Sequence, residues 1–162
     1  MTTAYLSLGS NLGNRRVHLL AAIAQLRASR AIAQIRVAHF YETQPVGGVI
    51  QDNFLNTAVA VETELSADQL LESLHRLEYA EHRRRFVHWG PRTLDIDIIF
   101  FGDEHIHTDT LTIPHPEAAN RKFVLVPLLE ISGPDRQIQR QLADWLAETN
   151  DQTEIIKLGR DA

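Results

Sequence analysis

The sequence contains no cysteine. This absence excludes disulfide bridges, thiolate nucleophiles and cysteine-ligated zinc or iron–sulfur centres. No apolar run approaches the ~20 residues that a membrane-spanning helix needs, and no basic, apolar and small-residue leader follows Met1, so no signal peptide is expected. Together these absences predict a soluble cytoplasmic protein that makes no use of a membrane.

An excess of positive charge is also missing. The chain has 16 Lys and Arg against 21 Asp and Glu, a net charge of -5, which argues against a dedicated nucleic-acid binder. Five of the basic residues nevertheless cluster in one segment: Arg76, Arg83, Arg84, Arg85 and Arg92. A basic segment on an acidic chain favours a small anionic ligand, although a solvated helix end is an equally open interpretation.

The 162 residues are enough for one domain with a real core, and we expect residues 1–162 to form a single domain and a monomer. Hydrophobic patterns predict strands at 4–8, 35–41, 54–64 and 94–101, and helices at 15–29 and from about Ser66. This βαββαβ order is typical of a ferredoxin-like α+β fold. Loops are expected at 42–53 and 82–91. An apolar segment at 123–131 and a helix at 139–148 follow as C-terminal additions, and the polar tail has no assigned structure.

Two aspartates stand out in the strand expected at 94–101. Asp95 and Asp97 are two residues apart, so both side chains leave the same face of the strand, with Cα atoms about 6.5–7 Å apart. Carboxylates held together in a half-buried strand repel each other unless a cation lies between them. Either arginine or Mg²⁺ satisfies this requirement. The alternative is an edge strand with two solvated aspartates.

Cationic side chains surround this pair in the sequence. They are Arg83, Arg85 and Arg92, with His115 and Arg121 further on. Guanidinium groups suit phosphate oxygens, and phosphoryl transfer depends on positioning and on neutralisation of charge. No GxxxxGK[ST] loop is present. The segment Gly9–Gly13 lacks the spacing of a dinucleotide-binding loop and is better interpreted as a tight turn than as a phosphate cradle.

A third set of residues suits a flat ring. Phe54 and Asn56 share one strand face, Thr43 and Pro45 precede them, and Phe123 lies downstream. An aromatic ring beside an amide stacks on and hydrogen-bonds a heteroaromatic ligand, although the pattern alone favours Phe54 and Phe123 as core residues. The eight histidines lack metal-ligand spacing, so surface histidines are favoured over a zinc site.

With these motifs in place, the chain resembles the 6-hydroxymethyl-7,8-dihydropterin pyrophosphokinase family from Ala4 to about Pro134. The most specific matching segment runs from Trp89 to Asp97. The other matching segments are Gly9–Asn11, Tyr41–Gly47, Phe54–Asn56, Leu111–His115 and Asn120–Arg121. The resemblance implies a ferredoxin-like fold. It also implies transfer of pyrophosphate from ATP to the hydroxymethyl oxygen of the pterin in folate biosynthesis, with AMP as the second product.

The resemblance also implies roles for individual residues. Asp95 and Asp97 would hold two Mg²⁺ ions, and they would share the catalytic role with Arg83 and Arg92. The implied ATP-binding residues are Glu78, Arg85, Arg92, Ile98, Thr112, His115 and Arg121. The implied pterin-binding residues are Thr43, Pro45, Val46, Phe54, Asn56, Trp89 and Phe123. In this arrangement Phe54 and Phe123 would sandwich the ring, and Asn56 would read its guanine-like edge.

Two other classes of function remain open at this stage. Ferredoxin-like sheets also bind single-stranded RNA through exposed aromatic residues. The acidic net charge and the paired aspartates argue against that use here. A small phosphate-ester hydrolase on the same scaffold is the second alternative, and AMP formation that depends on added pterin would distinguish it from a pyrophosphokinase.

Overall fold

The computed structural model describes residues 1–44, 52–80 and 93–159. Its strands are β1 (Thr2–Ser10), β2 (Ile32–Val37), β3 (Tyr41–Thr43), β4 (Phe54–Thr63), β5 (Asp95–Phe101), β6 (Ile106–His107), β7 (Thr112–Ile113) and β8 (Ile155–Lys157). Its helices are α1 (Arg15–Ala28), α2 (Ala67–Ala80), the short 3-10 helix η1 (Ala118–Asn120), α3 (Lys122–Ile131) and α4 (Arg136–Glu148).

The main sheet is antiparallel throughout. Its strands follow the order β5-β1-β4-β3-β8, and β2 also pairs with β4. β1 therefore lies between β4 and β5, and β5 forms one edge. The predicted combination of helices with an antiparallel sheet is confirmed.

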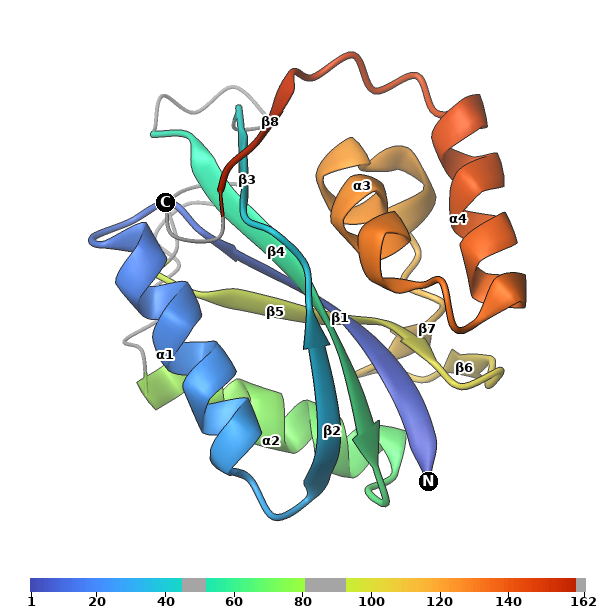
Figure 1. Cartoon of the computed structure of the whole chain (residues 1–162). Coiled ribbons are helices and arrows are strands. Elements are labelled where there is room, and N and C mark those ends of the chain that lie inside the picture. The colour runs from blue at the N-terminus through green and yellow to red at the C-terminus, as the bar shows by residue number, and fades with distance from the viewer. Residues whose placement is uncertain (45–51, 81–92, 160–162) are drawn as a thin grey trace.

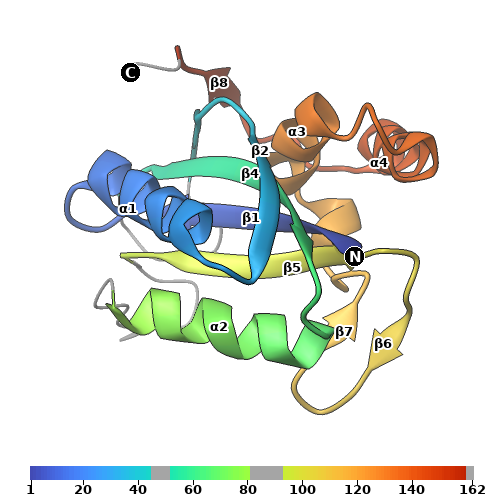
Figure 2. The ribbon, with the colours of Figure 1, turned by 60° about the horizontal axis from the view of Figure 1, so that its bottom comes forward.

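Helices cover both faces of this sheet (Figures 1 and 2). On one face, Leu6 and Leu8 of β1 pack with Leu19 of α1 and Leu74 of α2 in a core of buried aliphatic residues. On the other face, a second core joins the sheet to α3 and α4. Its members include Tyr5, Ala58, Phe100, Leu125, Leu128 and Leu142. Because side chains alternate along each strand, every strand residue belongs to one of these two faces.

Local sequence signals explain where the helices begin. Asn14 caps α1 by accepting a hydrogen bond from the Val17 amide, and Asp135 caps α4 by accepting from the Ile138 amide. Ser66 caps α2 as expected: its hydroxyl accepts from the Gln69 amide, and the Gln69 side chain accepts from the Ser66 amide in return. None of the described helices has the length and apolar character needed to cross a membrane.

The continuous strand predicted at 35–41 is wrong, because it divides into β2 and β3. Val37 pairs with Val59 and Tyr41 with Asn56, so β4 has one residue fewer between the two pairs. Within the break, the Thr57 hydroxyl lies 3.2 and 3.1 Å from the carbonyl oxygens of residues 38 and 39. Side-chain contacts thus add to the backbone bond kept here, from the Ala38 amide to the Ala58 carbonyl.

Other local expectations also change. Gly9 and Ser10 belong to β1 and not to a tight turn. The turn comes after them, and Gly13 has a φ of 71°, which glycine adopts without strain. The loop expected before Arg121 contains the short β6-β7 hairpin, and the unassigned tail contains β8. The loops expected at 42–53 and 82–91 fall mostly outside the described residues.

Candidate active site

Asp95 and Asp97 lie on β5, at the edge of the main sheet. Their partners on β1 are Gly9 and Ser7, and both carboxylates leave the sheet face that carries α3. Ile96 and Ile98 point to the opposite face and are buried in the core beneath α1 and α2. Both aspartates are half-buried at this edge of the sheet.

A cavity of about 400 Å³ opens beside this edge. It lies between α2, β5 and the segment that contains β7. Its lining includes Glu78, Asp95, Asp97, Ile98, Thr112 and His115. Six of the residues predicted to take part in metal or ATP binding therefore surround one space.

Two contacts fix the walls of this cavity. The Glu78 carboxylate is only 4% exposed and accepts a hydrogen bond of 2.9 Å from the Ile96 amide, which attaches α2 to β5. On the other wall, the His115 amide donates to the Ile99 carbonyl at 3.0 Å. The His115 Nε2 atom lies 4.0 Å from Asp97 Oδ1. Burial lowers the pKa of His115, and Arg121 lowers it further against the opposing effect of nearby carboxylates. The imidazole is therefore neutral at pH 7.

Some of the residues predicted to bind the pterin lie on the same face of the sheet as Asp95 and Asp97. Asn56 Nδ2 donates a 2.7 Å hydrogen bond to Thr43 Oγ1, so its amide reaches toward β3 on one side. On the other side Asn56 Oδ1 lies 2.7 Å from the position that a Cβ atom would take on Gly9. Only glycine leaves this space open. The amide plane of Asn56 therefore extends across the sheet from β3 toward β1.

Strand register connects the two groups of residues. Asp95 pairs with Gly9, and Gly9 pairs with Asn56. Since neighbouring strands are about 4.8 Å apart, the backbones of Asp95 and Asn56 are separated by roughly 10 Å across a residue without a side chain. The acidic edge and the amide therefore face one shared surface.

The two predicted stacking residues approach this surface from different elements. Phe54 begins β4, is half-buried and lies on the same strand face as Asn56. Phe123 is the second residue of α3 and packs against the core on that side. The Arg121 guanidinium lies 5.7 Å from the centre of the Phe123 ring and is paired with the Glu117 carboxylate. Arg121 thus lies beside Phe123, and its charge also acts on His115 at the cavity.

The remaining predicted residues fall outside the described part of the chain. They are Pro45, Val46, Arg83, Arg85, Trp89 and Arg92.

Comparisons with known proteins decide the family. Residues 5–133 match the family model described as 7,8-dihydro-6-hydroxymethylpterin-pyrophosphokinase (HPPK). The chain belongs to the HPPK family. The family predicted from the sequence is therefore confirmed.

Two curated relatives illustrate the HPPK match. A 2-amino-4-hydroxy-6-hydroxymethyldihydropteridine pyrophosphokinase of Bacillus subtilis is 43% identical over 147 residues, covering 91% of this chain and 85% of the relative. The bifunctional protein FolKE of Lactococcus lactis subsp. cremoris is 44% identical over 151 residues, covering 93% of this chain. The chain thus spans only 43% of the length of that bifunctional relative.

Solved structures support the fold. The Plasmodium falciparum HPPK-DHPS structure with pteroate aligns with a TM-score of 0.61 and 18% identity, over 80% of this chain and 39% of that one. At this identity the likeness bears on the fold alone, and it agrees with an HPPK domain built from helices and an antiparallel sheet.

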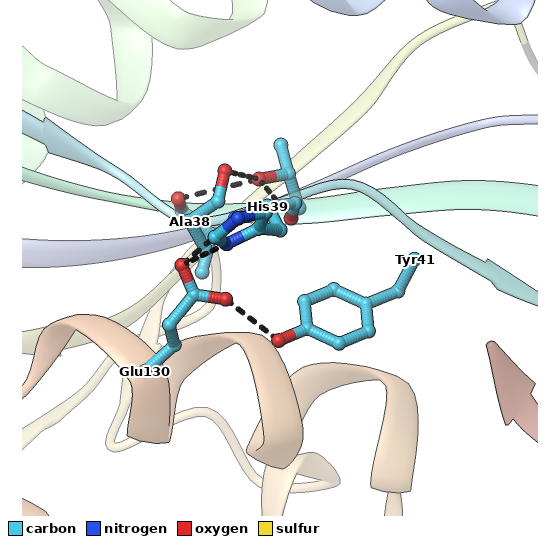
Figure 3. Close-up of polar contacts among 6 residues, drawn as sticks. Ala38, His39, Tyr41 and Glu130 are labelled. Carbon is cyan, nitrogen blue, oxygen red and sulfur yellow. Dashed lines mark hydrogen bonds and ion pairs between the residues drawn. The ribbon is translucent and has the colours of Figure 1, made fainter. Parts of the chain in front are cut away.

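The sequence reasoning missed a polar network centred on Glu130 of α3 (Figure 3). Glu130 of α3 accepts hydrogen bonds from the His39 amide and the Tyr41 hydroxyl, at 2.9 and 2.6 Å, and its carboxylate is 2.8 Å from His39 Nδ1. Glu130 follows Phe123 by seven residues, two helical turns along the same side of α3. This spacing was the available signal in the sequence. It could not predict that Glu130 has His39 and Tyr41, at the break between β2 and β3, as its partners.

Titration of this network leads to a testable effect on stability. Burial alone would raise the pKa of Glu130, but hydrogen bonds from Tyr41 and His39 outweigh it and hold that pKa below its usual value. The stabilisation is therefore present above the ordinary carboxyl pKa of about 4.3 and is lost as the pH falls through the folded-state pKa. Glu130→Gln should lower the free energy of unfolding at pH 7 by about 1–3 kcal/mol, and by less at pH ~3.

Urea unfolding at both pH values measures this difference. Glu148→Gln, an exposed residue at the end of α4, is the matched control and should change neither value. An equal loss at both pH values in Glu130→Gln would contradict the titration argument.

Proposed function

We propose that this chain transfers the terminal pyrophosphate of ATP to the hydroxymethyl oxygen of 6-hydroxymethyl-7,8-dihydropterin, giving AMP and the pterin diphosphate. The observation that carries the proposal is the row Asp95–Gly9–Asn56 across three strands. It puts a candidate metal edge and a candidate ring-reading amide on one face, about 10 Å apart. Membership of the HPPK family supplies the reaction that fits this arrangement.

Incubation with Mg-ATP, with and without the pterin alcohol, tests this function. Chromatography should detect AMP only when the pterin is present. AMP released at the same rate without pterin would indicate hydrolysis, and ADP as the main product would indicate transfer of a single phosphate.

The acidic edge suits Mg²⁺. No cluster of three His, Cys, Asp or Glu side chains suited to a metal occurs within 1–44, 52–80 and 93–159. Asp95 and Asp97 offer two carboxylates, which is the usual protein share of a Mg²⁺ site that substrate phosphates complete. We propose that these residues hold two Mg²⁺ ions together with ATP. When bound, the ions supply charge neutralisation for the transferring phosphates.

The walls of the cavity suit the nucleotide. Glu78 keeps β5 in place through the Ile96 amide, and a neutral His115 beside Asp97 retains an imidazole that hydrogen-bonds without adding charge. We assign Ile98, Thr112, His115 and Arg121 to the ATP side, with Arg83, Arg85 and Arg92 as the expected phosphate-binding arginines. Catalysis by such a set depends on orientation and on charge, and Arg83 and Arg92 are expected to share the catalytic role with the aspartates.

The pterin is assigned to the face that Asn56 crosses. Asn56 carries both a donor and an acceptor, which matches the alternating edge of a guanine-like ring. Thr43 orients the amide through its hydroxyl, and Phe54 and Phe123 are proposed to stack on the two faces of the ring. Pro45, Val46 and Trp89 complete the proposed lining.

Loss of one stacking partner should weaken the pterin alone. Phe54→Ala is expected to reduce pterin affinity by about 1–3 kcal/mol, the range for lost aromatic burial and stacking, while ATP affinity stays the same. Calorimetry with each ligand measures both. Tyr79→Ala, which truncates an aromatic ring that is 84% exposed on α2, is the control. Unchanged pterin affinity in Phe54→Ala would return this residue to a purely structural role.

The fold and organisation belong to the same proposal. We infer a ferredoxin-like core with C-terminal additions, on the strength of the strand order β5-β1-β4 and the pairing of β2 with β4. We further propose that residues 1–162 act as one catalytic domain, as a monomer in the cytoplasm. Light scattering of the purified protein tests the monomer.

A further inference from the structure

The segment after α4 contacts two different walls of the proposed pterin site. We call residues 149–158 the C-terminal strap. In Figure 1 this segment leaves α4, passes α3 and reaches β3 as β8. The HPPK family model matches residues 5–133, so the strap lies outside the matched region. Every residue assigned above to the pterin lies before it.

The first contact of the strap is at the beginning of α3. Asp151 Oδ2 accepts a 2.8 Å hydrogen bond from the amide of Lys122, the first residue of this helix. Arg121, at the N-cap position, makes no capping bond with its own side chain. Asp151 therefore acts as the cap from 29 residues away, with its negative charge at the positive end of the helix dipole.

Asp151 is itself held in place. Its Oδ1 atom accepts from the Thr153 amide at 2.8 Å, and its own amide donates to Thr149 Oγ1 at 3.2 Å. Burial would raise the pKa of Asp151, but the bonds from Thr153 and Lys122 prevail and lower it. The carboxylate is therefore ionised at neutral pH, the form that a helix N-terminus favours.

The first turn of α3 depends on this cap because a hydrogen bond is missing further along the helix. Pro127 lies inside the helix and has no amide hydrogen, so it cannot donate to the Phe123 carbonyl four residues earlier. The turn that carries Phe123 is thus supported by one helical hydrogen bond fewer than usual. A cap from outside the helix replaces part of this support.

The second contact of the strap is with β3. Strand β8 pairs with it in antiparallel register, Thr43 opposite Ile155 and Tyr41 opposite Lys157. The Leu158 amide adds a 2.8 Å bond to the Phe40 carbonyl. Without β8, the three-residue β3 would pair on one side only, with β4. Thr43, which orients Asn56, therefore has β8 as its outer neighbour.

Phe123 and Thr43 thus stand at opposite ends of one short connection, from Asp151 to Ile155. We propose that the C-terminal strap fixes the spacing between Phe123 and the Thr43–Asn56 pair, and that Asp151 is a positioning residue for pterin binding. The inference rests on the proposed function. Stacking a flat ring requires its neighbours to be in place within a fraction of an ångström, because ~1 Å of misplacement costs on the order of 100-fold in rate.

Kinetics of two variants test the strap. Asp151→Ala removes the acceptor, and Lys122→Pro removes the donor while keeping a residue that suits the first position of a helix. Each should raise KM for the pterin roughly tenfold, with KM for ATP unchanged. The double variant should be no worse than Asp151→Ala alone, because that variant has already lost the bond that Lys122→Pro removes. Asp151→Asn, which keeps one acceptor oxygen, should recover most of the wild-type KM.

Controls separate positioning from general destabilisation. Asp144→Asn, on the exposed surface of α4, should leave every constant unchanged. Thermal unfolding identifies variants that are folded at the assay temperature, and only these are compared. Three outcomes would each contradict the proposed role of the strap. They are a folded Asp151→Ala with wild-type KM for the pterin, additive effects in the double variant, and an equal rise in both KM values. If the wild-type protein forms no pterin-dependent AMP, the proposed function fails, and the strap's role in pterin binding fails with it.

Discussion

Asp97→Asn should lower the rate of AMP formation by at least ~1,000-fold, equivalent to about 4 kcal/mol of lost transition-state stabilisation. Asparagine keeps the shape of the side chain but loses the charge that a hard divalent cation requires. Asp97 is half-buried beside His115 at the cavity, and its backbone pairs with Ser7 of β1. Because the substitution is isosteric and the side chain is not in the core, the fold should survive.

The assay follows AMP from Mg-ATP and the pterin alcohol over a range of Mg²⁺ concentrations. The wild-type rate should rise and saturate with Mg²⁺, whereas the variant should stay low over the whole range. Asp103→Asn, in the exposed turn just after β5, makes the same chemical change away from the cavity and should keep full activity. A variant at residue 97 with wild-type rates at limiting Mg²⁺ would exclude this carboxylate from metal binding.

The central elements of the fold follow from local patterns in the sequence. Hydrophobic patterns located β4 and β5, and Ser66 as a candidate N-cap located the start of α2, where the structure adds its partner Gln69. The prediction that Asp95 and Asp97 share one face of a strand also needed only the two-residue period of strands. In each case the information lies within a few residues of the element that it specifies.

What could not be predicted depends on partners that are distant in the sequence. The strand break at 38–40 is formed by Thr57 and by Glu130 of α3, 91 residues from His39. The assignment of β8 requires β3 as its partner, since a three-residue strand has little pattern of its own. The role of Gly9 depends on Asn56, which reaches over it from the neighbouring strand. Such contacts become visible only when the sheet is assembled.

Asn56→Ala should weaken pterin binding by about 100-fold and leave ATP affinity nearly unchanged. Two hydrogen bonds to the ring edge, each worth about 1–1.5 kcal/mol, account for a loss of this size. Selectivity between the ligands follows from register, because Asn56 and Asp95 are separated by the whole width of β1 at Gly9. Calorimetry with pterin, and separately with Mg-ATP analogue, measures the two affinities.

Removing the partner that orients the Asn56 amide tests the role of this amide more strictly than removing the amide itself. Thr43→Val keeps the volume of this buried residue but removes the oxygen that accepts from Asn56 Nδ2. It should weaken pterin binding by a smaller factor, and in combination with Asn56→Ala it should add little, since Thr43 acts on the ring only through that amide. Asn53→Ala, on the exposed approach to β4, is the control. Fully additive losses would mean that Thr43 contacts the ligand independently, and unchanged affinity in Asn56→Ala would remove the amide from ring recognition altogether.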